Sequence, residues 1–226
     1  MRTAEGKVTF FGNPAAKTVI WMHTFSDEGE RAFSMLPDAL RQRAALVTIG
    51  LSEAEWNAKL SPWEAPALFR GEPFAGGADA WLETLTGRIM PAVTVQEGLA
   101  PAQHLLAGYS LAGLFALYAF YRTDVFCSAA SISGSLWYPG FADFVRERRP
   151  CRAPEHLYLS LGDRESSVRN PVLASVWEHT AAISSYFSDS GVHTVFEATS
   201  GGHTNHAAER TAAALQWLIQ QYKCTI

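Results

Sequence analysis

Short runs of apolar and β-branched residues recur along the chain, separated by longer segments with apolar residues at helical spacing. The strand-length runs span residues 7–11, 18–23, 45–49, 104–107, 128–132, 156–161 and 194–198. The run at 18–23, TVIWMH, is β-branched and aromatic, as is typical of a buried parallel strand. The amphipathic segments span residues 30–43, 79–95, 111–121, 171–188 and 205–222. Alternation of this kind predicts βαβ units, and therefore an α/β fold whose central sheet is mostly parallel and carries helices on both faces.

Two residues are expected to set helix boundaries within the second amphipathic segment. Asp79 stands where an N-cap is expected, because apolar residues follow it at helical spacing. Pro91 has no N–H to donate, so we expect it to kink or end that helix.

Residues 51–78 break the alternation, with three prolines, two tryptophans and three glycines among them. The segment is too aromatic for a linker and too interrupted for one helix, so it predicts an ordered excursion over one end of the sheet. Its large aromatic residues are Trp56, Trp63, Phe69 and Phe74. Aromatic side chains of this size mostly pack against the body of a protein. They can also line a pocket beneath the excursion, and Trp63 is the main candidate for that role.

Composition and charge indicate a globular chain and exclude several classes of protein. Of the 226 residues, 48% are apolar and 18% are charged, which suits one well-filled domain over residues 1–226. A net charge of −4 without a basic run gives no footprint for nucleic acid or for a membrane surface. No apolar window is long enough to predict a membrane span.

The cysteines and the first residues bear on the compartment. Cys127, Cys151 and Cys224 are odd in number and widely spaced, so they match neither a disulfide framework nor a metal site. The first residues lack the charged start and apolar core of a signal peptide. We therefore expect reduced cysteines in a cytoplasmic protein.

The candidate chemistry centres on residues 104–121, where an apolar run ends in Gly108-Tyr109-Ser110-Leu111-Ala112-Gly113 and a helical pattern follows. As strand, sharp turn and helix, this segment places Ser110 at the tip of the turn. The hydroxyl then stands clear of the sheet at the start of a helix, as a nucleophile requires. Small residues two before and two after the serine let strand and helix pass closely. The pattern predicts a nucleophilic serine, with an ordinary tight turn as the alternative.

A serine hydroxyl needs a general base, which is normally a histidine. In parallel α/β sheets, functional residues gather in the loops at the carboxyl ends of strands, which is where His23, His203 and His206 stand. His203 follows the last strand through two glycines, so its loop can reach the serine, and we predict it to be the base. We expect a structural or pocket-wall role for His23. No third ligand accompanies His203 and His206, so no metal site is predicted.

The carboxylate that orients the base is expected at a strand end between the serine and the histidine in sequence. The segment GDRE, after the run at 156–161, offers Asp163 and Glu165. We prefer Glu165 as the triad acid and keep two alternatives, Asp163 and a serine–histidine dyad that lacks a close acid. A solvated turn is the plain interpretation of both carboxylates. The resulting order of nucleophile, acid and histidine is that of α/β-hydrolases.

Acyl transfer also needs two main-chain donors for the oxyanion. The N–H of Leu111, next after the nucleophile, is one. The second is expected from Thr24 or Phe25, in the loop after the run at 18–23, and we select Thr24. Trp137, which follows the run at 128–132, is expected to line the acyl pocket, with core packing as its alternative.

These motifs resemble the "putative esterase" branch of the α/β-hydrolase superfamily, which includes esterase D (S-formylglutathione hydrolase) and enterobactin-type siderophore esterases. The resemblance covers most of the chain and rests on GYSLAGLFAL, SISGSLW, LYLSLGDRE and GGHTNHAAER. It implies the α/β-hydrolase fold and a Ser–acid–His hydrolase without a metal or an organic cofactor. In that branch the acid usually lies three residues after the glycine that ends its strand, which supports Glu165. Two departures are Ala112 in place of the usual glycine and a glutamate in place of the more common aspartate.

The expected activity is hydrolysis of a carboxylic ester or thioester of a small molecule, through an acyl-enzyme on Ser110. One alternative is a non-catalytic binding or scaffold protein on the same fold. Another is an acyltransferase or peptidase that uses the same triad.

Overall fold

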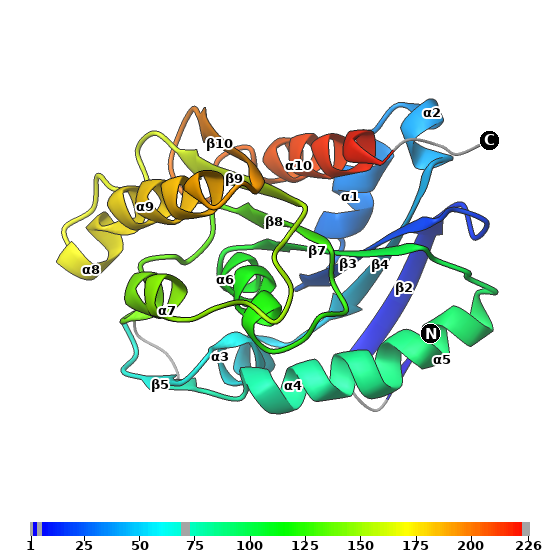
Figure 1. The fold of residues 1–226 in the computed structure, drawn as a ribbon, viewed down its shortest axis with the longest axis horizontal. Coiled ribbons are helices and arrows are strands. Elements are labelled where there is room, and N and C mark those ends of the chain that lie inside the picture. Colours follow the sequence, from blue (N-terminus) through cyan, green and yellow to red (C-terminus); the bar gives the residue numbers. More distant parts are fainter. Residues whose placement is uncertain (1, 4–5, 69–72, 223–226) are drawn as a thin grey trace.

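A computed structural model describes residues 2–3, 6–68 and 73–222, and an eight-stranded sheet forms its centre (Figure 1). In spatial order, the strands are β1 Arg2–Thr3, β2 Gly6–Gly12, β4 Ala44–Gly50, β3 Thr18–Thr24, β7 Gln103–Tyr109, β8 Ser128–Ile132, β9 His156–Gly162 and β10 His193–Thr199. Strands β4, β3, β7, β8, β9 and β10 are neighbours in this order and run parallel to one another. Strand β2 pairs antiparallel with both β4 and β1. The mostly parallel sheet confirms the predicted α/β class.

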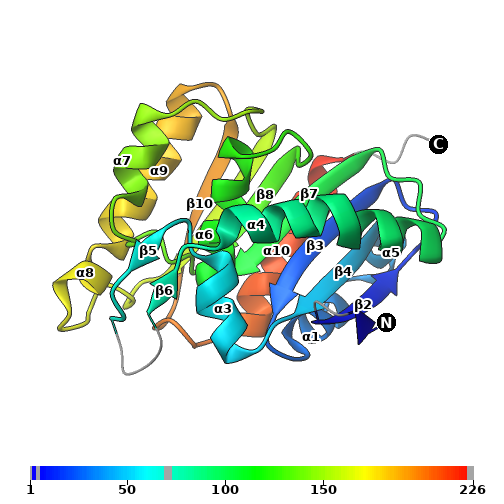
Figure 2. The ribbon, with the colours of Figure 1, turned by 90° about the horizontal axis from the view of Figure 1, so that it is seen from below.

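Helices cover both faces of this sheet (Figures 1 and 2). One face carries α1 Glu28–Ser34, α2 Asp38–Arg41 and α10 Ala207–Gln221. The other face carries α4 Ala78–Thr84, α5 Met90–Gln96, α6 Leu111–Tyr118, α7 Phe141–Glu147 and α9 Val176–Asp189. Successive strand side chains serve the two cores in turn. In β3, Val19 and Trp21 belong to one apolar cluster and Ile20 and Met22 to the other.

Two of the expected helices are divided in the structure. The segment predicted as one helix over 30–43 forms α1 and α2, because Pro37 adopts an extended backbone, with ψ of 143°, immediately before α2. The segment predicted over 171–188 forms α8 Pro171–Ala174 and α9, which meet at Ser175.

The helix expected over 79–95 begins earlier and does not end at its proline. Its N-cap is Gly77, whereas Asp79 accepts a hydrogen bond from the Tyr118 hydroxyl and pairs with Arg122. A π-helical turn, Leu85–Ile89, joins α4 to α5, and Pro91 lies in the first turn of α5. The helical segment accommodates this proline at the π-helical turn directly before it, where the Met90 N–H donates to Leu85 O and the ordinary bonding pattern is interrupted.

The excursion at 51–78 is ordered where the structure describes it. Helix α3, Glu53–Leu60, begins with a capping box in which Ser52 and Glu55 exchange side-chain and main-chain hydrogen bonds. The short strands β5 Glu64–Ala65 and β6 Phe74–Ala75 pair antiparallel. Phe69 lies outside the described residues. Within the described part of the chain, no helix combines the length and apolar character needed to cross a membrane.

Candidate active site

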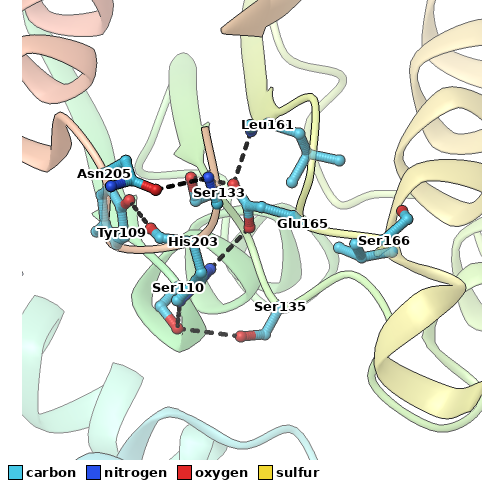
Figure 3. A network of polar contacts seen from close by, with 12 residues as sticks. Tyr109, Ser110, Ser133, Ser135, Leu161, Glu165, Ser166, His203 and Asn205 are labelled. Carbon is cyan, nitrogen blue, oxygen red and sulfur yellow. Dashed lines mark hydrogen bonds and ion pairs between the residues drawn. The ribbon is translucent and has the colours of Figure 1, made fainter. Parts of the chain in front are cut away.

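Ser110 lies at the tip of the turn between β7 and α6 (Figure 3). Its φ of 58° and ψ of −123° are in a region that residues other than glycine rarely adopt. Hydrogen bonds hold this backbone, because the Ser110 N–H donates to Ile132 O at 3.0 Å and its carbonyl accepts from the Ser135 N–H at 3.0 Å. A Cβ on Gly108 would lie 2.2 Å from the main chain of Ala112, so strand and helix pass too closely for any other residue there. The turn thus presents the serine hydroxyl at the carboxyl edge of the sheet.

The loop between β10 and α10 brings His203 to this serine (Figure 3). Its Nε2 lies 3.1 Å from Ser110 Oγ, and its Nδ1 lies 2.7 Å from Glu165 Oε2. The main-chain carbonyl of His203 accepts a hydrogen bond from the Tyr109 hydroxyl, and the two rings meet edge to face with 5.6 Å between centroids. Ser110, His203 and Glu165 therefore form one hydrogen-bonded chain.

The two carboxylate oxygens of Glu165 have different partners. Oε1 accepts from the Ser133 hydroxyl at 2.7 Å, from the Gly162 N–H at 2.7 Å and from the Arg210 guanidinium at 3.0 Å. Oε2 is left to accept from His203. Burial by itself raises the pKa of Glu165, but hydrogen bonds from His203 and the Gly162 N–H outweigh it and hold the pKa below its ordinary value. The carboxylate is therefore ionised when it faces the imidazole.

Asp163, the alternative acid, is engaged elsewhere. Its Oδ1 accepts from the Gly201 N–H at 2.8 Å, and its own N–H donates to Thr199 O at 2.7 Å. Within the described residues it makes no hydrogen bond or ion pair with His203. Asp163 thus joins the end of β9 to the loop that carries the histidine, and the geometry favours Glu165 as the acid.

The candidate oxyanion donors come from two segments, the start of α6 and the end of β3. The N–H of Leu111 is the first of α6 and has no acceptor among the described residues, as expected at a helix start. Thr24 ends β3 and Phe25 follows it, and both line the same cavity as Ser110. The Phe25 ring is exposed and stacks on Trp56 with 4.0 Å between centroids.

A cavity of about 420 Å³ opens beside Ser110. Its aromatic wall is formed by Phe25, Trp56 and Tyr109, and its charged residues are Glu28, Arg31 and Glu209. Trp56 shows that the excursion contributes to this wall. A second cavity of about 460 Å³ shares Thr24 and Phe25 with the first but does not reach the serine, so the candidate chemistry belongs to the smaller one.

Trp63 and Trp137, the expected substrate contacts, do not line either of these cavities. The Trp63 Nε1–H donates to Pro139 O at 3.0 Å, and its carbonyl accepts from the Tyr138 hydroxyl at 2.6 Å. Trp137 is buried and its ring lies 6.1 Å from that of Phe74. These contacts are those of the packing alternative, and substrate binding by either tryptophan stays a prediction.

His23 forms a neutral wall of the cavity beside Ser110. Its Nε2 accepts from the Trp81 Nε1–H at 2.9 Å, and its ring meets Phe115 edge to face with 5.1 Å between centroids. Burial, assisted by the nearby charge of Lys59, lowers the pKa of His23 to about 3. An imidazole that cannot take a proton near neutral pH is no general base. His206 has a left-handed backbone before α10, with φ of 54°, and lines the same cavity.

Three polar residues beside the candidate triad were not assigned from the sequence. Ser133 and Arg210 bind Glu165, and Ser135 Oγ lies 3.3 Å from Ser110 Oγ. The two serines carried a signal, because both follow β8 at the carboxyl edge of the sheet. Arg210 closes the motif GGHTNHAAER, but the motif assigned it no chemistry, and an arginine within an amphipathic helix is ordinarily solvated. Among the residues that the structure describes, no three His, Cys, Asp or Glu side chains gather closely enough to hold a metal ion.

Comparison with known proteins places this geometry in a family. The chain is similar to the "Uncharacterized protein YbbA" of Bacillus subtilis, at 22% identity over 208 residues that cover 87% of this chain and 83% of that protein. Its fold is similar to an IroE-like serine hydrolase from Shewanella oneidensis, with a TM-score of 0.78, 17% identity and coverage of 96% of this chain and 75% of that one. It is also similar to the siderophore hydrolase EstA from Aspergillus nidulans, with a TM-score of 0.73, 18% identity and coverage of 93% and 84%. The family model described as "Putative esterase" matches residues 16–208, and the chain therefore belongs to this esterase family of the α/β-hydrolase fold.

Proposed function

We propose that the protein is a serine hydrolase that cleaves a carboxylic ester or thioester of a small molecule through an acyl-enzyme on Ser110. The observation that carries this proposal is the chain of contacts from Ser110 Oγ to His203 Nε2, at 3.1 Å, and from His203 Nδ1 to Glu165 Oε2, at 2.7 Å. Membership of the esterase family supports the same class of reaction. No metal or organic cofactor is needed for it.

In the acylation step, Ser110 Oγ attacks the carbonyl carbon of the ester while its proton passes to His203 Nε2. The carbonyl oxygen becomes an oxyanion, which accepts hydrogen bonds from the N–H groups of Leu111 and Thr24. The tetrahedral intermediate then collapses, the bond to the leaving oxygen or sulfur breaks, and the imidazolium gives its proton to the leaving group. The acyl group stays on Ser110.

In the deacylation step, a water molecule gives a proton to His203 Nε2 and attacks the acyl carbon. Collapse of the second intermediate releases the carboxylic acid and returns the proton to Ser110. Glu165 stays ionised throughout, because its hydrogen bonds favour the charged form. It fixes the imidazole tautomer and stabilises the imidazolium that forms in each step.

A fluorophosphonate probe and a panel of p-nitrophenyl esters and thioesters test the proposal together. We expect the wild type to be labelled and to hydrolyse at least one ester, and Ser110→Ala to abolish the labelling. Ser110→Ala and His203→Ala should each lower kcat by about 10³-fold or more. Ser166→Ala is the matched control, because Ser166 lies one residue after Glu165 and accepts a hydrogen bond from the Trp177 N–H, away from the candidate triad.

Three other outcomes would each point to a different function. A folded wild type that neither reacts with the probe nor hydrolyses any ester would indicate the binding or scaffold alternative. Ester products that form with added alcohols would indicate an acyltransferase. Cleavage of peptides in preference to esters would indicate a peptidase.

A further inference from the structure

Arg210 places a buried positive charge beside the candidate triad. The residue lies in the first turn of α10, immediately after the loop that carries His203, and it is 2% exposed. Burying an arginine costs free energy of desolvation unless acceptors pair with its N–H groups. The acceptors of Arg210 therefore indicate its structural role.

The guanidinium of Arg210 joins the ends of three strands through four hydrogen bonds. Nη1 donates to Glu165 Oε1 at 3.0 Å, after β9, and to Ser133 Oγ at 2.8 Å, after β8. Nη2 donates to Ser200 O at 3.0 Å and to Gly202 O at 3.1 Å, after β10. One side chain thus contacts the candidate acid and both sides of the turn that leads to the candidate base.

The backbone around Arg210 leaves no spare room. A Cβ on Gly162 would lie 2.2 Å from Gly201 O and 2.6 Å from Arg210 Nη2. The end of β9 and the histidine loop therefore approach each other against the guanidinium, and a shift of that group would move both.

The same bonds decide which oxygen of the acid meets the base. Arg210 Nη1 and the Ser133 hydroxyl both donate to Glu165 Oε1, so Oε2 is left for His203 Nδ1 at 2.7 Å. Arg210 Nη2 holds both sides of the turn that leads to His203. The guanidinium therefore sets the position of Glu165 and of the His203 loop relative to each other.

We propose that Arg210 is a positioning residue, and this inference rests on the proposed hydrolase function. Its four hydrogen bonds hold Glu165 and the His203 loop in their catalytic geometry, with Oε2 of Glu165 facing the imidazole.

Two substitutions separate the geometry from the charge. Arg210→Lys keeps the positive charge but cannot make the four bonds of the guanidinium, whereas Arg210→Met removes both. The readouts are kcat and KM, measured separately, and the downfield NMR signal of the His203 Nδ1 proton in its hydrogen bond to Glu165, which needs no activity. We expect both variants to lower kcat about tenfold with little change in KM, and to broaden or shift that proton signal.

Arg43→Met is the matched control for general loosening. Arg43 also uses its guanidinium on main-chain carbonyls, those of Ile219 and Tyr222 at the other end of α10, and it does not contact Glu165. A fall of kcat in this control as large as in Arg210→Met would overturn the proposal. So would an unchanged kcat, or an unchanged Nδ1 proton signal, in Arg210→Lys. If the wild type hydrolyses no ester, the proposed function fails, and the Nδ1 proton signal of Arg210→Lys still decides whether Arg210 positions Glu165 against His203. Arg210→Gln takes the place of Arg210→Met if that variant does not fold.

Discussion

Glu165 and Asp163 lie two residues apart, yet the structure gives them different partners. Glu165 is buried and faces the imidazole of His203, whereas Asp163 is exposed and binds the main chain of Gly201. The difference comes from the turn after β9. Arg164 lies between them and donates its N–H to Gly201 O, and the chain then turns Glu165 back so that its carboxylate accepts the Gly162 N–H. A hydrogen-bonded turn, rather than the acid type, selects the partner of the histidine.

Paired amide substitutions test this assignment. Glu165→Gln replaces an ionised acceptor by an amide, which cannot stabilise the imidazolium, and we expect kcat to fall by about 10²- to 10³-fold. Asp163→Asn keeps an oxygen that can accept from the Gly201 N–H, so we expect kcat to change less than about threefold. Steady-state rates on the best p-nitrophenyl ester measure both. A silent Glu165→Gln beside a crippled Asp163→Asn would make Asp163 the acid.

At the scale of elements, the hydrophobic pattern located strands better than helix ends. A continuous apolar run predicts a buried strand, as it does for β3. The alternation of such runs with helical patterns predicts that the sheet is parallel. The division of 30–43 into α1 and α2 depends on Pro37, which the periodicity alone does not weigh. Asp79 was expected to cap α4, but it serves Tyr118 and Arg122, contacts that only the tertiary fold creates.

The same limit applies to the residues of the candidate site. Ser110, His203 and Glu165 could be selected because parallel strands deliver their carboxyl ends to one edge of the sheet. Arg210 ends the motif GGHTNHAAER, but no role could be given to it, because its place in α10 is typical of a surface arginine until β8, β9 and β10 are brought together around it. Groups at strand ends can thus be predicted to meet, whereas a group that reaches the site from a helix is recognised only once the strands are in place.

Two glycines test how closely the elements approach. A Cβ at Gly108 would collide with the backbone of Ala112, so Gly108→Ala must separate β7 from α6, and we expect a loss of stability of about 2 to 4 kcal/mol. Gly87 is its matched control. It lies exposed in the helical segment between α4 and α5 with nothing within 4 Å of an added Cβ, so Gly87→Ala should stabilise by about 0.5 to 1 kcal/mol. Urea unfolding measures both, and equal effects would contradict the close approach.

At the scale of the whole molecule, the order of the strands in the sheet brings the residues of the candidate site together. β3, β7, β8, β9 and β10 are neighbours in the sheet although the chain visits them over most of its length. Their carboxyl ends carry, in that spatial order, the candidate oxyanion loop, the candidate nucleophile, Ser133 with Ser135, the candidate acid and the candidate base. Two separate apolar cores, one on each face, hold this edge in shape. Protonation of a group that is buried against one of these cores, next to the site, therefore changes the free energy of unfolding of the whole fold.

His23 is such a group, and it makes the stability of the protein depend on pH. Its pKa is about 3 in the folded protein and near 6.5 in the unfolded chain, so below pH 6.5 the unfolded chain binds a proton that the folded protein does not. Stability must therefore fall as the pH falls through this window, by about 2 kcal/mol between pH 6.5 and 5.0 from His23 alone.

The variant His23→Gln tests this dependence. The amide oxygen of the glutamine can still accept from Trp81 but does not titrate, so the unfolding free energy of the variant should depend less steeply on pH. His104 and His156, whose pKa values burial also lowers, are present in both proteins and cancel in the comparison. Urea unfolding at pH 6.5, 5.75 and 5.0 measures the two slopes. If the unfolding free energies of the two proteins change equally with pH, the buried imidazole takes up its proton in the folded protein, and His23 is not a neutral wall of the cavity.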